Sequence, residues 1–205
     1  MTEIFHIALV DDDAAVLDSL QLYFARHQVT TTCFTSAEAL IAALDDGLQP
    51  DCIVSDIRMP GMSGLDLFDR LKARHCTVPL ILITALADID MAVAAIKTGA
   101  SDFIEKPFDE GRLLASIQNA VALRRQRASQ EAEIDKMRSR FNTLSARQRQ
   151  VMELAAAGLS NKEIALRLAI SPKTVENHRA WVMERMGAKS LADLVRIAMR
   201  IEAQS

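Results

Sequence analysis

Cysteine is scarce in this chain of 205 residues, and the three cysteines are an odd number. Cys33, Cys52 and Cys76 lie within or beside apolar runs, so we expect buried thiols rather than a framework of disulfides. No pair of cysteines has zinc-ligand spacing with histidines. These features exclude the disulfide-rich secreted class and favour a reducing compartment.

Long hydrophobic runs and glycine-rich loops are also missing. No stretch approaches the length of a membrane span, and Met1–Glu3 lacks the charged and apolar regions that open a secretory signal. We therefore expect a cytoplasmic protein without a membrane partner. The sequence contains no glycine-rich phosphate loop of either nucleotide-binding type, which argues against a nucleotide enzyme.

Charge is distributed unevenly along the chain. Residues 1–122 hold 8 Lys and Arg against 18 Asp and Glu, a net charge of −10. Residues 123–142 carry +3 and residues 143–205 carry +4, which gives the whole chain its net charge of −3. The sequence therefore predicts an acidic domain followed by a basic one that could bind a polyanion, although so mild an excess supports nucleic acid only weakly.

Short apolar runs alternate with amphipathic segments five times through residue 123. Such runs are typical of strands buried on both faces of a parallel sheet. The alternation predicts an α/β fold of five βα units with right-handed crossovers. Strands are expected near 4–10, 28–34, 51–55, 79–84 and 101–105, and helices near 14–26, 36–45, 64–75, 88–98 and 109–125.

Chemically active side chains follow several of these predicted strands. Asp11 and Asp12 end the first strand, Asp56 ends the third, and Thr84 and Lys106 end the last two. The carboxyl ends of parallel strands share one edge, where α/β folds place their sites. Crowded carboxylates repel one another and call for a hard divalent cation, for which Mg²⁺ is the best match. A carboxylate beside Mg²⁺ and a lysine can attack a phosphoryl donor and become an acyl phosphate.

A single aspartate at a strand end is more often a turn former or a helix N-cap than a catalytic group. Asp13 fits that description, because a predicted helix begins directly after it. An acid, a hydroxyl and a base on one edge are harder to explain as turn chemistry. We therefore predict a phosphorylation site.

Residues 124–142 differ from the rest, being highly charged and free of Pro and Gly. Ile134, Met137, Phe141 and Leu144 follow at steps of 3, 4 and 3 residues, which gives a helix a narrow apolar seam. A helical linker that uses this seam and a plain solvated helix are both consistent with the pattern.

From residue 143 onward the sequence predicts only helices. Capping boxes begin at Ser145 and Ser160, Ser171 precedes a proline at the first helical position, and Ser190 caps a fourth helix. Two short helices joined by a brief turn are typical of a helix-turn-helix. We therefore expect a small all-α domain of four helices.

The predicted third helix presents a polar face that could contact DNA. In a helix-turn-helix, the N-terminal residues of the second motif helix lie at base edges in the major groove. Asn suits adenine, Glu can accept from cytosine and Ala can touch a thymine methyl, so Asn177, Glu176 and Ala180 are candidate base contacts. The side chains assigned to phosphates or salt bridges are Lys162, Lys173, Thr174, Arg179, Arg185 and Lys189.

The roles of two aromatic residues of this helix remain undecided, with two alternatives for each. His178 is either a packed, hydrogen-bonded histidine or a base contact, and Trp181 is either a packing residue or a backbone contact. A charged helix face is also commonly just solvated, so the pattern alone does not establish DNA binding.

Both parts of the chain resemble known families. Residues 4–122 resemble the receiver domain of two-component systems through VDD at 10–12, SDIRMPGMSG at 55–64, ITA at 83–85 and FIEKPF at 103–108. Residues 143–203 look like a LuxR-type helix-turn-helix through LSARQRQV, GLSNKEIA and SPKTVENHR. The combination resembles the response regulators of the NarL/FixJ family.

The resemblance implies the organisation of the chain. It implies a flavodoxin-like, doubly wound receiver at 1–123, a helical linker at 124–142 and a DNA-binding domain at 143–205. It also implies partners: a cognate sensor histidine kinase, double-stranded DNA and RNA polymerase.

The resemblance further assigns roles at the predicted acidic edge. Asp56 would be the phosphoacceptor, and Asp11, Asp12 and Asp56 would ligate Mg²⁺ together with the backbone carbonyl of Arg58. Other residues would bind the phosphoryl group or respond to it. Lys106 would hold a phosphoryl oxygen as a point charge, with a cis bond to the next proline; the remaining switch residues would be Thr84, Ala85 and Phe103.

A homodimer is expected when Asp56 is phosphorylated. A single helix-turn-helix with a net charge of +4 buries a small interface, so a monomer should bind DNA weakly at physiological salt. The expected dimer surface is helix 88–98 with strand 101–105, where Met91, Val93 and Ile96 offer apolar side chains.

Two other functions compete with a phosphorylation-controlled regulator. A phosphatase of the haloacid-dehalogenase type needs a second carboxylate two residues after the nucleophile and a large cap; here Arg58 occupies that position and no segment fits a cap. A constitutive DNA-binding protein would be favoured by loss of an acidic or lysine position, and none is lost. We therefore predict a transcription regulator rather than an enzyme.

Overall fold

The structure is a computed structural model that describes residues 5–84 and 89–202. It divides into two compact units, Met1–Gln126 and Arg127–Ser205. Within the described ranges, no helix combines the length and the hydropathy that a membrane crossing requires.

The N-terminal unit is built on a sheet of five parallel strands in the order β2-β1-β3-β4-β5. This order confirms the predicted doubly wound α/β fold. The strands are β1 (His6–Val10), β2 (Thr30–Phe34), β3 (Cys52–Asp56), β4 (Leu80–Thr84) and β5 (Asp102–Glu105).

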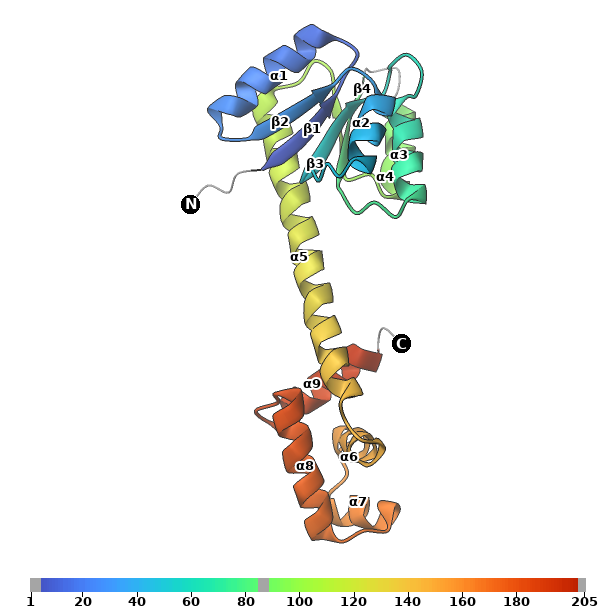
Figure 1. The fold of residues 1–205 in the computed structure, drawn as a ribbon, viewed down its shortest axis with the longest axis vertical. Helices are drawn as coiled ribbons and strands as arrows, with labels where there is room; N and C mark the ends of the chain where they lie inside the picture. The colour runs from blue at the N-terminus through green and yellow to red at the C-terminus, as the bar shows by residue number, and fades with distance from the viewer. Residues whose placement is uncertain (1–4, 85–88, 203–205) are drawn as a thin grey trace. The chain divides into compact units, whose positions relative to one another are not determined.

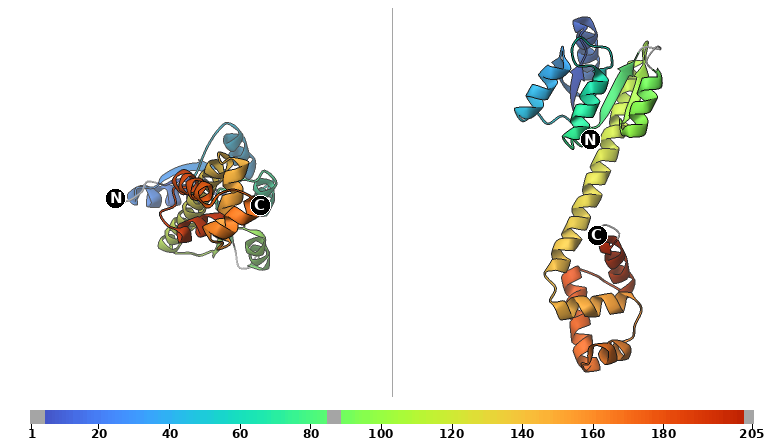
Figure 2. Two further views of the ribbon diagram at one scale, coloured as in Figure 1. Left: turned by 90° about the horizontal axis from the view of Figure 1, so that it is seen from below. Right: turned by 90° about the vertical axis from the view of Figure 1, so that its right-hand side faces the viewer.

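Helices cover both faces of the sheet (Figure 1 and Figure 2). They are α1 (Ala14–Arg26), α2 (Ala37–Asp45), α3 (Gly64–Ala73), α4 (Ile89–Thr98) and α5 (Glu110–Asn142). One face packs against α1 and the first turns of α5, through buried residues such as Phe24 and Ile117. The other face packs against α2, α3 and α4, through Leu40 and Leu67 among others. The central strands β1, β3 and β4 are buried along most of their length, as the sequence predicted. The edge strands β2 and β5 are mostly half-buried, so the prediction of fully buried strands is wrong for these two.

Helix α5 runs without interruption from the sheet into the stretch 124–142 that the sequence marked as charged. The absence of Pro and Gly from that stretch allows one helix to continue. Of the apolar seam, Ile134 and Met137 are half-buried, and Phe141 packs against the core of the C-terminal unit.

Through residue 202, where the described part of the chain ends, the C-terminal unit contains four further helices, as predicted. They are α6 (Ala146–Ala156), α7 (Asn161–Leu168), α8 (Pro172–Met186) and α9 (Leu191–Glu202). Ser145, Ser160 and Ser171 are the N-caps of α6, α7 and α8, which satisfies backbone N–H groups that the first turns leave unpaired. The interior is formed by apolar residues from all four helices.

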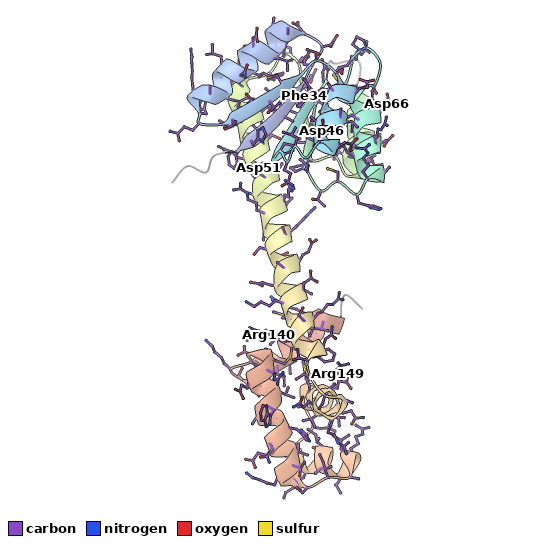
Figure 3. The ribbon with its side chains drawn as sticks, in the orientation of Figure 1. Phe34, Asp46, Asp51, Asp66, Arg140 and Arg149 are labelled. Atoms are coloured by element: carbon purple, nitrogen blue, oxygen red, sulfur yellow. The ribbon has the colours of Figure 1, made fainter. Side chains whose placement is uncertain are left out.

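Arginine side chains also hold the ends of these helices. Arg140 donates to the carbonyl of Met186 at the end of α8, and Arg149 donates to the carbonyl of Asn142 at the end of α5. Both arginines are labelled in Figure 3. Arg147 donates to the carbonyl of Leu168 at the end of α7. These basic groups are thus engaged in the fold.

Candidate functional site

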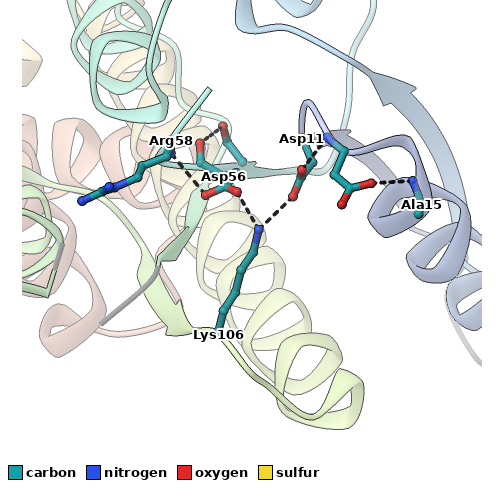
Figure 4. Close-up of polar contacts among 7 residues, drawn as sticks. Asp11, Ala15, Asp56, Arg58 and Lys106 are labelled. Carbon is teal, nitrogen blue, oxygen red and sulfur yellow. Dashed lines mark hydrogen bonds and ion pairs between the residues drawn. The ribbon is translucent and has the colours of Figure 1, made fainter. Parts of the chain in front are cut away.

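Four side chains meet at the carboxyl edge of the sheet, which we call the acidic edge: Asp11, Asp12, Asp56 and Lys106. One carboxylate oxygen from each aspartate lies within 4.8 Å of the others. The Lys106 Nζ donates to Asp56 Oδ2 at 2.5 Å and to Asp11 Oδ2 at 3.1 Å (Figure 4). The parallel register of β1, β3, β4 and β5 therefore brings together groups that lie up to 95 residues apart.

Burial differs among the groups of the acidic edge. Asp11 is 3% exposed, whereas Asp12 is exposed and Asp56 is half-buried. Burial raises the pKa of Asp11, with the Asp13 backbone N–H and the Lys106 ammonium acting in the opposite direction. Solvent can reach Asp12 and Asp56, so a phosphoryl donor or a hydrated cation has access to the edge.

Lys106 is the cation of this cluster. Burial acts to lower its pKa, but the hydrogen bonds and negative charges of Asp56 and Asp11 outweigh burial, so the pKa lies above its usual value. One ammonium cannot neutralise three carboxylates. The remaining negative charge and the all-oxygen donor set fit a hard divalent cation such as Mg²⁺.

The backbone around Asp56 is closely packed. The backbone N–H of Arg58 donates to Asp56 Oδ1 at 3.2 Å, and that of Ile57 donates to the Ile83 carbonyl at 2.9 Å. A Cβ at position 64 would lie 2.2 Å from the Asp56 carbonyl oxygen, so only glycine lets α3 begin this close to the strand. Sequence reasoning missed this role of Gly64; its position directly after the N-cap Ser63 was the available signal.

The other residues predicted around Asp56 occupy different environments. Thr84 is fully buried at the end of β4, and Phe103 is half-buried against the core on the α2–α4 face. Ala85 lies outside the described residues. The Lys106–Pro107 bond is cis, as the resemblance implied. Asp13 is the N-cap of α1 and accepts from the Ala15 backbone N–H at 2.9 Å, which confirms its predicted structural role.

A second candidate site lies on α7 and α8 of the C-terminal unit. The buried face of α8 consists of Val175, Val182 and Met186, as the spacing predicted. The turn between the two helices passes through Ala169 in the left-handed region, at φ 51°. The predicted DNA contacts that are exposed are Lys162, Lys173, Glu176, Asn177, Ala180 and Arg185, together with Lys189 beyond the end of α8.

Hydrogen bonds already engage part of this surface. Lys173 Nζ donates to Glu176 Oε2 at 2.8 Å, and this contact lowers the pKa of Glu176. Thr174 Oγ1 lies 2.8 Å from the hydroxyl of the N-cap Ser171. His178 is half-buried.

Arg179 has a structural contact. Its guanidinium donates to Asn161 Oδ1 at 2.7 Å and so joins α8 to the start of α7. The role of Arg179 in the fold is therefore to link the two helices of the motif.

Comparison with known proteins gives matches in both units. Residues 7–118 match the family described as "Response regulator receiver domain", and residues 142–198 match "Bacterial regulatory proteins, luxR family". The transcriptional regulatory protein FixJ of Bradyrhizobium diazoefficiens is 46% identical over 200 residues, which cover 98% of this chain and 97% of that protein.

Solved structures give the same result. Full-length FixJ from B. japonicum is 45% identical with a TM-score of 0.62, over 97% of this chain and 98% of that one. The response regulator StyR is 35% identical with a TM-score of 0.81, over 95% of this chain and 98% of that one. Receiver domains bind Mg²⁺ at an acidic pocket, and this chain has the corresponding cluster of aspartates. The chain therefore belongs to the two-component response regulators that join a receiver domain to a LuxR-type DNA-binding domain, a family of transcription regulators rather than enzymes.

Proposed function

We propose that a cognate sensor histidine kinase phosphorylates this regulator on Asp56, and that phosphorylation promotes dimerisation and sequence-specific binding to double-stranded DNA. The observation that carries the proposal is the meeting of Asp11, Asp12, Asp56 and Lys106 at the acidic edge. RNA polymerase would be a further partner of the DNA-bound regulator. Because its target is DNA, the protein would act in the cytoplasm of a bacterium.

The proposed chemistry is a phosphoryl transfer to a carboxylate. A carboxylate oxygen of Asp56 attacks phosphorus, the bond from phosphorus to the kinase histidine breaks, and the histidine nitrogen leaves with the electron pair. Lys106 holds a phosphoryl oxygen and offsets its negative charge. Asp11, Asp12, Asp56 and the Arg58 carbonyl would hold Mg²⁺, which supplies positive charge to the phosphoryl oxygens. Thr84, Ala85 and Phe103 would respond to the new group.

The proposed organisation has three parts: a receiver at 1–123, a helical linker at 124–142 and a DNA-binding domain at 143–205. In the last part, Glu176, Asn177 and Ala180 would contact base edges, since they are exposed on α8. The residues that would contact the DNA backbone are Lys162, Lys173, Thr174 and Arg185. His178, which is half-buried, would either pack against the helices or reach a base edge. The dimer would form through α4 and β5, where Val93 is exposed; the side chain of Met91 lies outside the described residues.

The direct test is labelling with acetyl phosphate, followed by intact-mass spectrometry. Wild type should gain one phosphoryl group in Mg²⁺ and none in excess EDTA. Asp56→Asn keeps the shape of the side chain but removes the nucleophile, so it should gain none. Labelling of Asp56→Asn to the wild-type level, or undiminished labelling in EDTA, would reject the proposal.

A further inference from the structure

The loop that follows Asp56 is tied to a helix distant in the sequence. Residues 57–63, which we call the phosphoacceptor loop, connect β3 to α3. The carboxylate of Glu38, in the first turn of α2, accepts the backbone N–H of Met62 at 2.9 Å. A Cβ at position 61 would lie 2.9 Å from the same Glu38 oxygen, so the carboxylate rests directly against Gly61, whose φ is +77°.

Glu38 extends from a helix that is packed on the sheet, and its carboxyl group favours the charged form. Its neighbours Ala37 and Leu40 are 0% exposed and fix α2 on the sheet. The pKa of Glu38 lies below its usual value, chiefly because its own backbone N–H and then that of Met62 donate to the carboxylate. The side chain therefore presents a charged acceptor to the loop from a helix whose first turns are packed in the core.

The two ends of the phosphoacceptor loop are held differently. Near Asp56, the backbone N–H of Ile57 donates to the carbonyl of Ile83, and that of Arg58 donates to the Asp56 carboxylate. Further along, the Glu38–Met62 hydrogen bond connects the loop to a separate element. The backbone carbonyl of Arg58, the proposed fourth Mg²⁺ ligand from the protein, lies between these two attachments.

We infer that Glu38 is a positioning residue for cation binding and phosphorylation at Asp56: it holds the Gly61–Met62 turn and thereby orients the loop that carries the Arg58 carbonyl. This inference rests on the proposed function. Groups that orient metal ligands typically change metal affinity about 10–100-fold when they are removed. Because Glu38 acts through the loop backbone, its removal should have an effect near the lower end, about tenfold.

Three variants of the full-length chain distinguish the effect of holding the loop in position from the effect of the negative charge of Glu38. Glu38→Ala removes the acceptor. Glu38→Gln removes the charge but keeps an oxygen that can accept the Met62 N–H. Asp46→Ala removes an exposed carboxylate at the opposite end of α2, where the cap is made by the backbone N–H of Asp46.

The readouts are amide hydrogen exchange of the loop without metal, Mg²⁺ affinity by NMR titration, and the rate of labelling by acetyl phosphate. Glu38→Ala should speed exchange at Met62, weaken Mg²⁺ binding about tenfold, and slow labelling at low but not at saturating Mg²⁺. Glu38→Gln and Asp46→Ala should stay close to wild type.

Two outcomes would overturn this inference alone. In one, wild type is labelled at Asp56 but Glu38→Ala matches Asp46→Ala in exchange and in Mg²⁺ affinity. In the other, Glu38→Gln loses as much Mg²⁺ affinity as Glu38→Ala, so that charge rather than positioning is responsible. A wild-type chain that is never labelled at Asp56 would instead overturn the proposed function, and this inference with it.

Discussion

Lys106 donates to Asp56 at 2.5 Å and to Asp11 at 3.1 Å, so its charge lies where phosphoryl oxygens would arrive. The Lys106 ammonium is positively charged, as Mg²⁺ is, and therefore repels the ion. Lys106→Ala should therefore slow labelling by acetyl phosphate on the order of 10²-fold, the typical loss for one preorganised group that stabilises developing negative charge. The same variant should bind Mg²⁺ at least as tightly as wild type.

Labelling kinetics and Mg²⁺ titration of Lys106→Ala test both parts of this prediction. Lys97→Ala, which removes an exposed lysine from the last turn of α4, is the matched control and should leave both measurements unchanged. Wild-type labelling rates in Lys106→Ala would show that Lys106 serves only to pair the aspartates.

Two exposed residues of α8 should have separable effects on DNA binding. Asn177→Ala should cost about 1–3 kcal/mol on the preferred duplex and relax the preference at one base pair. Lys173→Ala should weaken all sequences alike and reduce the salt slope by about one unit. Its pairing with Glu176 is between exposed groups, so DNA phosphates can compete for the lysine.

Binding selections from random duplexes, repeated at several salt concentrations, distinguish these two effects. An unchanged base preference in Asn177→Ala would place base recognition elsewhere on α8. A base-specific loss in Lys173→Ala would likewise contradict its assignment to phosphate.

At the residue scale, the sequence predicted the groups that end strands. Asp11, Asp56 and Lys106 meet because parallel strands end at one edge, which apolar periodicity reveals. The contact between Glu38 and Met62 could not be predicted in this way. It depends on how α2 packs beside the phosphoacceptor loop, and neither residue belongs to a pattern that indicates the other.

Among the elements, N-caps should have measurable energetic roles in the C-terminal unit. Ser171 Oγ accepts the Thr174 backbone N–H at 3.0 Å at the start of α8. Ser171→Ala should lower the free energy of unfolding by about 1 kcal/mol. Trp181, the one tryptophan of the chain, lies on α8 and reports on this unit, so urea denaturation followed by its fluorescence measures the effect.

Ser139→Ala provides the control for this substitution. Ser139 is exposed inside α5, where alanine is the better helix former, so stability should be unchanged or slightly higher. Equal losses in Ser139→Ala and Ser171→Ala would show that the cap contributes little.

The limits of the helices and strands were predictable because the hydrophobic periodicity changes at the positions where capping and turn residues occur. Each strand lies within two residues of its predicted limits. Capping motifs located the starts of α6, α7 and α8. The arginine contacts to helix-end carbonyls were not predictable, because a long basic side chain on a helix gives no sequence signal of the carbonyl that it will reach.

In the molecule as a whole, the distribution of charge argues for control by assembly. A DNA-binding domain with a net charge of +4 shares its chain with a receiver segment of −10, so a monomer should bind DNA weakly at physiological salt. Joining two such domains makes the second contact effectively intramolecular, which can raise avidity about 10²–10⁴-fold.

The proposed dimer surface includes Val93, which is 37% exposed on α4. Val93→Asp should oppose dimerisation without preventing phosphorylation, because burying an unpaired carboxylate is costly. Leu22→Asp is the matched control: Leu22 is 58% exposed on α1, which covers the opposite face of the sheet.

Sedimentation velocity with a labelled, selected duplex measures assembly and DNA occupancy in one experiment. Without acetyl phosphate, wild type should sediment as a monomer with little bound duplex. With acetyl phosphate and Mg²⁺, wild type and Leu22→Asp should form dimers that bind the duplex about 10²–10⁴-fold more tightly, whereas Val93→Asp should stay monomeric. Wild type that remains monomeric and binds the duplex equally in both states, despite full labelling of Asp56, would contradict control through phosphorylation-driven dimerisation.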